Sequence, residues 1–255
     1  MTVNPILVTG GTGNIGTRVV RMLHEADREV RILTRRPHSS SPGTEYVYGD
    51  TVRNHGLDEA VAGVDTLIHL AGGARGDDAA ADNLVAAARR AEVRHIVLIS
   101  VTGAERMPIG YFRRKAKAED IIIGSGLPFS ILRAAQLHDF VLPIIRSLSM
   151  LRIAPRGLRF EPVDADEVAA RLTALALGTP AGRVPDVVGP QVLDCREMVS
   201  TYNRVGELRR PIVSMRLWGT IGRAYREGAN LAEAGAVRGL RSWEEHLRGT
   251  AAVAG

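Results

Sequence analysis

The segment Val8–Gly16 combines the end of an apolar run with a glycine-rich turn. It places Gly10, Gly13 and Gly16 three residues apart. Glycines at such positions permit a tight turn, let the backbone approach a pyrophosphate, and allow the next helix to pack closely on a sheet. The first N–H groups of that helix then face the phosphates. We therefore expect a dinucleotide-binding loop. Its expected cofactor contacts are Gly10, Thr12, Gly13, Asn14, Ile15 and Gly16.

The next apolar run ends in Thr34, Arg35 and Arg36 and carries no carboxylate. An Asp or Glu at this place would accept from a ribose 2′-OH, whereas arginine suits a 2′-phosphate. We expect these three residues to contact the cofactor, and we expect NADP(H) to be preferred over NAD(H). Solvated surface charge is the alternative for either arginine, because all but two of the 33 basic residues are arginine.

Two further segments contain residues that could line a cofactor-binding site. Asp50 follows a third short apolar run and could accept from an adenine amino group; capping a turn or a helix is the alternative. The small residues Ala71, Gly72 and Gly73 follow a fourth run and would let a cofactor lie close over the strand ends. A plain strand-to-helix turn is the alternative there.

Tyr111 and Lys115 stand four residues apart, which places two side chains on one face of a helix. A lysine ammonium lowers the pKa of a nearby phenol from about 10, and the phenol can then donate a proton to a carbonyl oxygen. The ammonium can also hold the ribose hydroxyls of a nicotinamide nucleotide. We expect Lys115 at the nicotinamide and Tyr111 as a possible proton donor, with chance spacing as the alternative.

The elements that must position these residues follow one rhythm up to residue 135. Short aliphatic runs alternate with helical stretches, and the runs 66–70 and 95–100 are almost continuously apolar, as in strands buried on both faces. This alternation predicts an α/β fold with a Rossmann-type, doubly wound parallel sheet. Expected strands cover 3–9, 29–34, 45–48, 65–70, 94–100 and 128–133, and expected helices cover 14–26, 54–62, 78–91 and 111–124.

After residue 135 the pattern changes to helices joined by turn-rich connectors. A strand end followed by a capped helix is expected from residues 161–168, with the helix reaching about 177. Further helices are expected near 195–206 and near 217–231, and a capping box at Ser242 predicts a last helix. We expect a nucleotide-binding core over 1–135 and a small C-terminal substrate cap over 136–255, packed as one integrated unit.

The composition is that of a folded globular protein and excludes a disordered chain, since 45% of the 255 residues are hydrophobic and 24% are charged. No apolar run approaches ~20 residues and no signal sequence is visible, so we expect a cytoplasmic protein without membrane contact. The net charge of +5 comes from arginines spread along the chain, so no nucleic-acid partner is expected. The histidines lack metal-ligand spacing, and no metal site is expected.

In their order along the chain, these motifs resemble the short-chain dehydrogenase/reductase superfamily, and most closely its atypical NmrA-like and quinone-reductase-like branch. The resemblance covers nearly the whole chain. It implies a third catalytic group, a hydroxyl after the fifth strand, which Ser100 or Thr102 could supply. Its carrying segments are 9–16, 35–37, 50, 71–72, 95–100, 111–119 and 130–134, and more weakly 162–168 and 243–245.

The resemblance implies an NADPH-dependent oxidoreductase that transfers hydride to a small, apolar quinone, enone or carbonyl substrate. The alternative is a non-catalytic NADP(H)-binding redox sensor or regulator of the NmrA type, since the tyrosine is often absent or inactive in this branch. A nucleotide-sugar epimerase is less favoured, because residues 136–255 are few for that role. Both a monomer and a homodimer remain open.

Overall fold

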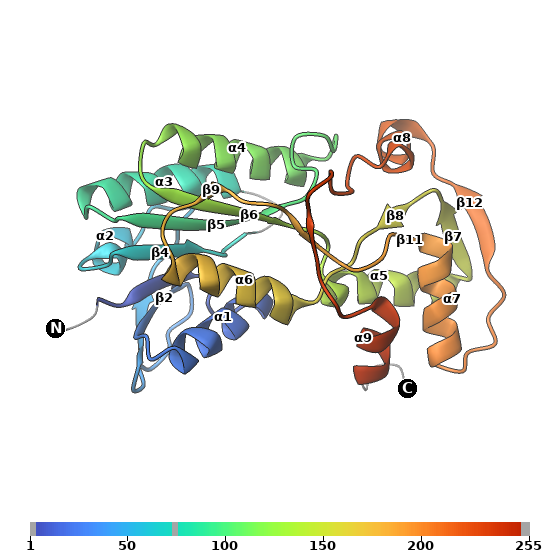
Figure 1. The fold of residues 1–255 in the computed structure, drawn as a ribbon, viewed down its shortest axis with the longest axis horizontal. Coiled ribbons are helices and arrows are strands. Elements are labelled where there is room, and N and C mark those ends of the chain that lie inside the picture. The colour runs from blue at the N-terminus through green and yellow to red at the C-terminus, as the bar shows by residue number, and fades with distance from the viewer. Residues whose placement is uncertain (1–3, 73–75, 251–255) are drawn as a thin grey trace. The chain divides into compact units, whose positions relative to one another are not determined.

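The structure is a computed structural model that describes residues 4–72 and 76–250. Its central strands follow the order β3-β2-β1-β4-β5-β6 (Figure 1). The pairs β1–β2, β1–β4, β2–β3 and β4–β5 are all parallel. This is the strand order of a dinucleotide-binding sheet, so the predicted Rossmann-type fold is confirmed. The strands span Ile6–Thr9 (β1), Val30–Thr34 (β2), Thr44–Tyr48 (β3), Thr66–His69 (β4), His95–Val101 (β5) and Phe129–Ala134 (β6).

Helices cover both faces of this sheet. Figure 1 shows α3 (Asp77–Arg90) and α4 (Gly110–Gly124) on one face, with α1 (Asn14–Glu25) and α6 (Ala165–Leu177) on the other. The sheet interior is aliphatic, because strands covered on both sides must bury every side chain. Because the strands are parallel, their carboxyl ends lie at one edge of the sheet, where open α/β folds bind ligands.

Most predicted element bounds agree with the structure to within one or two residues, but the helix expected over 54–62 is shorter. It is α2 and covers only Leu57–Val61. Asn54 has a φ of +52° and Gly56 a φ of +70°, so the chain adopts left-handed turns there and the helix cannot begin earlier. The helix expected over 217–231 likewise covers only Gly219–Glu227 (α8) and ends at Gly228, whose φ is +76°.

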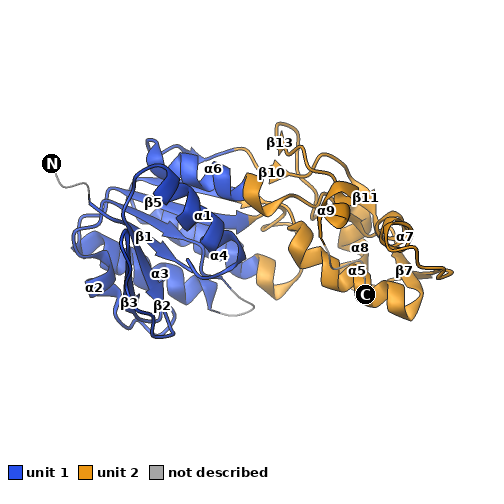
Figure 2. Cartoon of the chain, turned by 90° about the horizontal axis from the view of Figure 1, so that it is seen from below, with its two compact units in different colours: residues 1–100, 113–132, 168–184 blue, residues 101–112, 133–167, 185–255 orange. Residues whose placement is uncertain are grey.

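The chain divides into two compact units, which Figure 2 shows in blue and orange. The first contains residues 1–100, 113–132 and 168–184, and the second contains residues 101–112, 133–167 and 185–255. The sequence analysis expected two consecutive parts, whereas the observed units interleave along the chain. The boundary runs through β5, α4, β6 and α6, so that Lys115 belongs to the first unit and Tyr111 to the second.

The second unit has its own apolar core, in which Trp243 is fully buried. The helices around this core are α5 (His138–Leu151), α7 (Cys195–Val205) and α9 (Trp243–Gly249). Strand β7 (Ile153–Arg156) pairs in parallel with β12 (Val213–Arg216), and β8 (Arg159–Phe160) pairs antiparallel with β11 (Leu193–Asp194). The sequence analysis missed α5 and the β7–β12 ladder, but its capping box at Ser242 is present at the start of α9.

The remaining short strands are β9 (Gly182–Arg183), β10 (Val187–Val188) and β13 (Val237–Arg238). They extend the main sheet beyond β6. Among the described residues, no helix is both long enough and apolar enough to cross a membrane.

Candidate dinucleotide site

The glycine-rich loop joins β1 to α1 in a turn that requires glycine. Gly10 has a φ of +75°, and a Cβ on it would lie 2.6 Å from the Ala71 backbone nitrogen. A Cβ on Gly16 would lie 2.0 Å from the Gly10 carbonyl oxygen. The Gly13 N–H donates to the Gly10 carbonyl (3.0 Å), and α1 begins directly afterwards at Asn14. The turn therefore brings the N-terminus of α1 to the carboxyl end of β1, as pyrophosphate binding requires.

The N-terminus of α1 is exposed and positively polarised. Thr12, Gly13 and Asn14 are exposed, and Ile15 is half-buried. The first turn of α1 contains no acidic residue, so no carboxylate offsets the positive end of the helix dipole. The Arg18 guanidinium donates to the Asn14 carbonyl (2.8 Å) and adds a full positive charge one turn into the helix. Arg18 was not among the residues predicted from the sequence. Its position one turn into the helix after the glycine loop is the feature that points to it.

The end of β2 adds two more cations at the same sheet edge. Thr34 is buried, and its hydroxyl accepts from the Arg36 N–H (3.2 Å), which shapes the turn. Arg35 and Arg36 are exposed, and neither guanidinium is hydrogen-bonded or ion-paired to another residue that the structure describes. Because β2 pairs in parallel with β1, both arginines follow the strand beside the glycine loop. These residues fit a dinucleotide that carries a 2′-phosphate.

Asp50 has the turn geometry that the sequence analysis gave as its alternative role. Its Oδ1 accepts from the backbone N–H groups of Val52 (2.8 Å) and Arg53 (3.1 Å). This is an Asx turn, in which the side chain replaces a backbone acceptor. The adenine contact of Asp50 stays a prediction.

Lys115 is buried where β4 and β5 end. Its Nζ lies 3.3 Å from Asp77 Oδ2 and 3.5 Å from the Ile99 carbonyl oxygen. A Cβ on Gly72 would lie 2.8 Å from the same Nζ, so glycine makes room for the ammonium at this position. The sequence analysis left out Asp77, which balances the buried charge of Lys115. The cation therefore lies at the ligand-binding edge of the sheet.

The residues after β4 rest on a buried polar pair. Ala71 is half-buried, and its N–H donates to the Thr9 hydroxyl (3.4 Å); Gly73 lies outside the described residues. Thr9 Oγ1 is 2.6 Å from His69 Nδ1. Burial, and then the charge of Lys115, lowers the pKa of His69 to about 3. His69 is therefore uncharged at neutral pH, and its contact with Thr9 holds the hydroxyl to which the Ala71 N–H donates.

The two candidate hydroxyl groups differ in their contacts. The Ser100 hydroxyl donates to the buried carboxylate of Glu119, whose Oε2 also accepts from Arg183 (3.1 Å). Thr102 is fully buried, and its backbone N–H donates to the Ala134 carbonyl (3.0 Å). Among the described groups, the Thr102 hydroxyl has no hydrogen-bond partner. The Ser100 hydroxyl is thus engaged in a structural contact, whereas that of Thr102 is buried without a described partner.

Tyr111 and Lys115 both belong to α4, in its first and second turns. Tyr111 is half-buried, and its ring meets the edge of Phe112 with 5.5 Å between centroids. The regular turns of α4 give Tyr111 and Lys115 the same helix face, as their spacing predicts. Because they belong to different compact units, their common action on a substrate stays a prediction.

Sequence spacing also missed three buried side chains that gather in the second unit. His138, Asp164 and His246 each offer one ligand atom, and these atoms lie within 4.8 Å of one another. Asp164 already accepts from the Arg241 guanidinium (2.8 Å) and the Asp166 N–H (2.8 Å). The carboxylate is therefore already paired with a cation, and the expectation that the chain holds no metal stays a prediction.

Comparison with known proteins identifies the class to which this site belongs. Residues 10–149, more than half of the chain, match the family described as NAD(P)H-binding. The chain therefore belongs to this NAD(P)H-binding family, and the predicted class of dinucleotide-binding protein is confirmed.

Two relatives whose names state an activity match this chain over more than half of its length. The NAD(P)H azoreductase of Xenophilus azovorans is 26% identical over 213 residues, which cover 78% of this chain and 72% of the azoreductase. The sterol demethylase protein B of Methylococcus capsulatus is 28% identical over 170 residues, which cover 60% of this chain and 51% of that protein. The chain thus spans about half the length of this second relative.

The fold also matches a solved structure along almost its entire length. The NADPH-dependent quinone oxidoreductase of Escherichia coli, in complex with NADPH, superimposes with a TM-score of 0.80 at 17% identity. The match covers 95% of this chain and 98% of the oxidoreductase. The two chains therefore share the same fold.

Proposed function

We propose that the chain is an NADP(H)-dependent oxidoreductase that reduces a small quinone, enone or carbonyl compound. The observation that carries this proposal is the exposed, acid-free N-terminus of α1 behind its glycine turn, with Arg35 and Arg36 following the adjacent strand. The absence of a carboxylate in Thr34–Arg36 favours a 2′-phosphate over a free ribose hydroxyl. The azoreductase and quinone oxidoreductase named above support the redox assignment.

Lys115 is the residue that we propose to hold the nicotinamide ribose. A bound NADPH supplies hydride. Asp77 and the Ile99 carbonyl orient the Lys115 ammonium, which leaves it a donor for ribose hydroxyls at the strand ends. Tyr111 would donate a proton to the substrate oxygen. The Thr102 hydroxyl is a better candidate than that of Ser100 to hold this oxygen, because it has no partner among the described groups. Since Thr102 is buried, substrate binding must expose its hydroxyl.

Calorimetric titration with NADPH, NADH, NADP+ and NAD+ tests the cofactor proposal. We expect the phosphorylated pair to bind more tightly and Arg35→Ala to weaken NADPH binding roughly 10- to 100-fold, as loss of a hydrogen bond to a charged group implies. Arg94→Ala is the matched control, because Arg94 precedes β5 at the opposite edge of the sheet and pairs with Asp65. Equal affinity for NADH and NADPH, or equal losses in both variants, would contradict the 2′-phosphate assignment.

NADPH oxidation in the presence of a quinone and enone panel tests the activity. We expect substrate-dependent turnover that falls in Tyr111→Phe while the affinity for NADPH is kept, because the phenol serves the substrate and not the cofactor. Tight NADPH binding without turnover on any acceptor would instead favour the non-catalytic sensor of the NmrA type.

A further inference from the structure

Three arginines that the proposed function does not use line a pocket in the second unit. The pocket has a volume of about 500 Å³ and is lined by Arg156, Gly157, Ser214, Arg216 and Arg226. All five belong to residues 133–167 or 185–255, and none of the lining residues is acidic. A volume of this size is typical of a small-molecule site.

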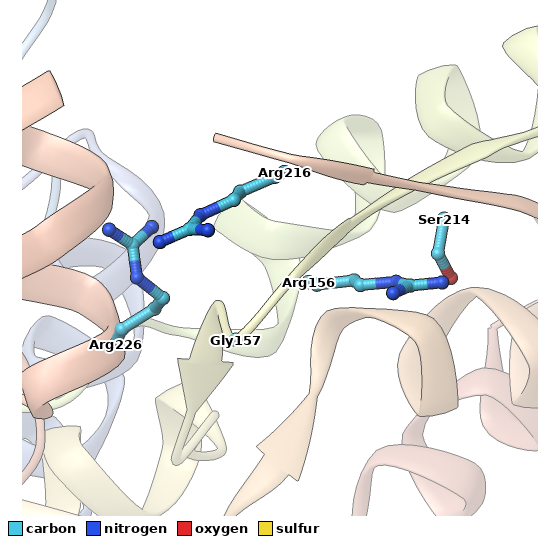
Figure 3. Close-up of a pocket in the computed structure, with 5 residues that line it drawn as sticks. All are labelled: Arg156, Gly157, Ser214, Arg216 and Arg226. Atoms are coloured by element: carbon cyan, nitrogen blue, oxygen red, sulfur yellow. The ribbon is translucent and has the colours of Figure 1, made fainter. Parts of the chain in front are cut away.

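The β7–β12 ladder pairs the backbones of two of these arginines. Arg156 and Arg216 are direct partners in the parallel register of the two strands. Like charges directly opposite each other destabilise a strand pair. Neither guanidinium forms an ion pair with a described carboxylate, so the protein itself does not relieve the repulsion. Figure 3 shows that the two side chains extend in different directions, so an anion in the pocket can approach either charge.

The third cation, Arg226, is held in position by groups that leave its charge uncompensated. Its NH1 donates to the Leu217 carbonyl oxygen (2.7 Å), and its side chain is half-buried. Gly157 has a φ of +73°, and a Cβ on it would lie 2.7 Å from Arg226 Cγ. Glycine at this position therefore lets the arginine stem pass against the backbone.

Figure 3 shows the Arg216 and Arg226 guanidinium groups pointing toward each other from β12 and α8. The Arg216 guanidinium carbon lies 4.5 Å from the Trp218 ring centre, a cation–π contact that restricts its orientation. Arg156 extends toward Ser214, whose hydroxyl accepts from Arg196 (2.7 Å) and so can donate its own proton to a ligand. Two oriented forks and a hydroxyl donor match the oxygens of a compact anion.

We propose that this pocket binds the phosphate or clustered carboxylate groups of an acidic small molecule, with Arg216 and Arg226 as the clamp. The bound group carries at least two negative charges, because three guanidinium groups share the pocket without an acidic partner. The pocket shares no residue with the glycine loop, at which we expect the dinucleotide phosphates to bind a helix N-terminus. It does not depend on the redox activity proposed above.

Titration of the full chain, saturated with NADPH and held at constant ionic strength, tests this inference. The probes are inorganic pyrophosphate and citrate, followed by calorimetry. We expect saturable binding of at least one probe with a stoichiometry of one, weakened at least tenfold in Arg216→Ala and Arg226→Ala. Preference for pyrophosphate assigns a phosphate ligand, and preference for citrate assigns a carboxylate ligand.

Arg223→Ala is the matched control, because Arg223 lies on α8 with Arg226 but pairs with Glu227 (3.0 Å). We expect its affinity for either probe to stay within twofold of the wild type. Absence of saturable binding, or equal weakening in Arg223→Ala, would overturn the proposal. Arg216 is exposed, so its variant keeps the test valid if Arg226→Ala fails to fold.

Because NADPH binding is titrated first on the same preparations, before the anion is added, the two proposals can fail separately. Loss of the anion signal with NADPH binding intact would reject the pocket and leave the dinucleotide site standing.

Discussion

At the scale of single residues, the site requires glycine at positions where any Cβ atom would clash with a neighbouring group. Gly16 and Gly72 lack a Cβ where one would meet the Gly10 carbonyl oxygen and the Lys115 ammonium. Lys115 in turn needs Asp77, because a buried cation without a partner is strongly destabilising. Small changes at these positions are therefore expected to have large effects.

Gly16→Ala should abolish NADPH binding and lower the thermal stability of the protein. The added Cβ would lie 2.0 Å from the Gly10 carbonyl oxygen, so the turn and the start of α1 must move apart. Calorimetric titration and the melting temperature measure the two effects. Gly124→Ala is the control, since a Cβ there meets nothing within 4 Å, and it should behave like the wild type. Wild-type NADPH affinity in Gly16→Ala would disprove the role of the turn.

His69 should make the protein sensitive to acid. The unfolded chain takes up a proton near the ordinary pKa of 6.5, whereas the folded chain does so only near pH 3. The unfolded state therefore binds more protons between these values, and stability falls as the pH is lowered. Between pH 6 and pH 4 the wild type should lose about 1.4 kcal/mol of unfolding free energy per pH unit more than His69→Gln. Urea denaturation measures this difference, and identical pH profiles would contradict it.

At the scale of elements, local patterns predicted the strands and helices of the main sheet well. Continuous apolar runs mark buried strands, and their positions depend on a few neighbouring residues. The start of α2 was predicted three residues too early, because left-handed turns at Asn54 and Gly56 override the helical pattern. Helix α5 was missed, although its buried residues Val141 and Ile145 lie four apart.

Helix α9 provides a test of a predicted cap. Ser242 Oγ accepts from the Glu245 N–H (3.3 Å), and Glu245 accepts from the Ser242 N–H (2.8 Å). Ser242→Ala should lower the unfolding free energy by about 0.5–2 kcal/mol, since it leaves the Glu245 N–H without its acceptor. Chemical denaturation gives the value. Ser147→Ala is the control, because this exposed hydroxyl in α5 bonds only its own helix at Pro143, and a loss as large as that of Ser242→Ala would argue against the cap.

At the scale of the whole molecule, the two compact units share continuous elements. The chain passes between them within β5, α4, β6 and α6, so unfolding of one unit would break elements of the other. The glycine loop and Lys115 belong to the first unit, and Thr102, Tyr111 and the arginine pocket belong to the second. The cofactor contacts that we propose at the glycine loop and Lys115 therefore belong to one unit, and the anion pocket that we propose belongs to the other.

Thermal unfolding should accordingly be a single cooperative transition. Both tryptophans, Trp218 and Trp243, belong to the second unit, so their fluorescence reports that unit, whereas far-UV circular dichroism reports both. We expect the two signals to change at the same temperature, and saturating NADPH to raise both together. A fluorescence transition at a separate temperature would show that the units unfold independently.

The sequence by itself determined the parallel α/β core, the dinucleotide loop and the arginines after the second strand, because each follows from the spacing of a few neighbouring residues. Only the tertiary structure decided that Asp77 neutralises Lys115, that Glu119 engages Ser100, and that Arg156 lies opposite Arg216. These contacts join residues that are distant along the chain. They depend on strand register and on how helices pack, which no local pattern encodes.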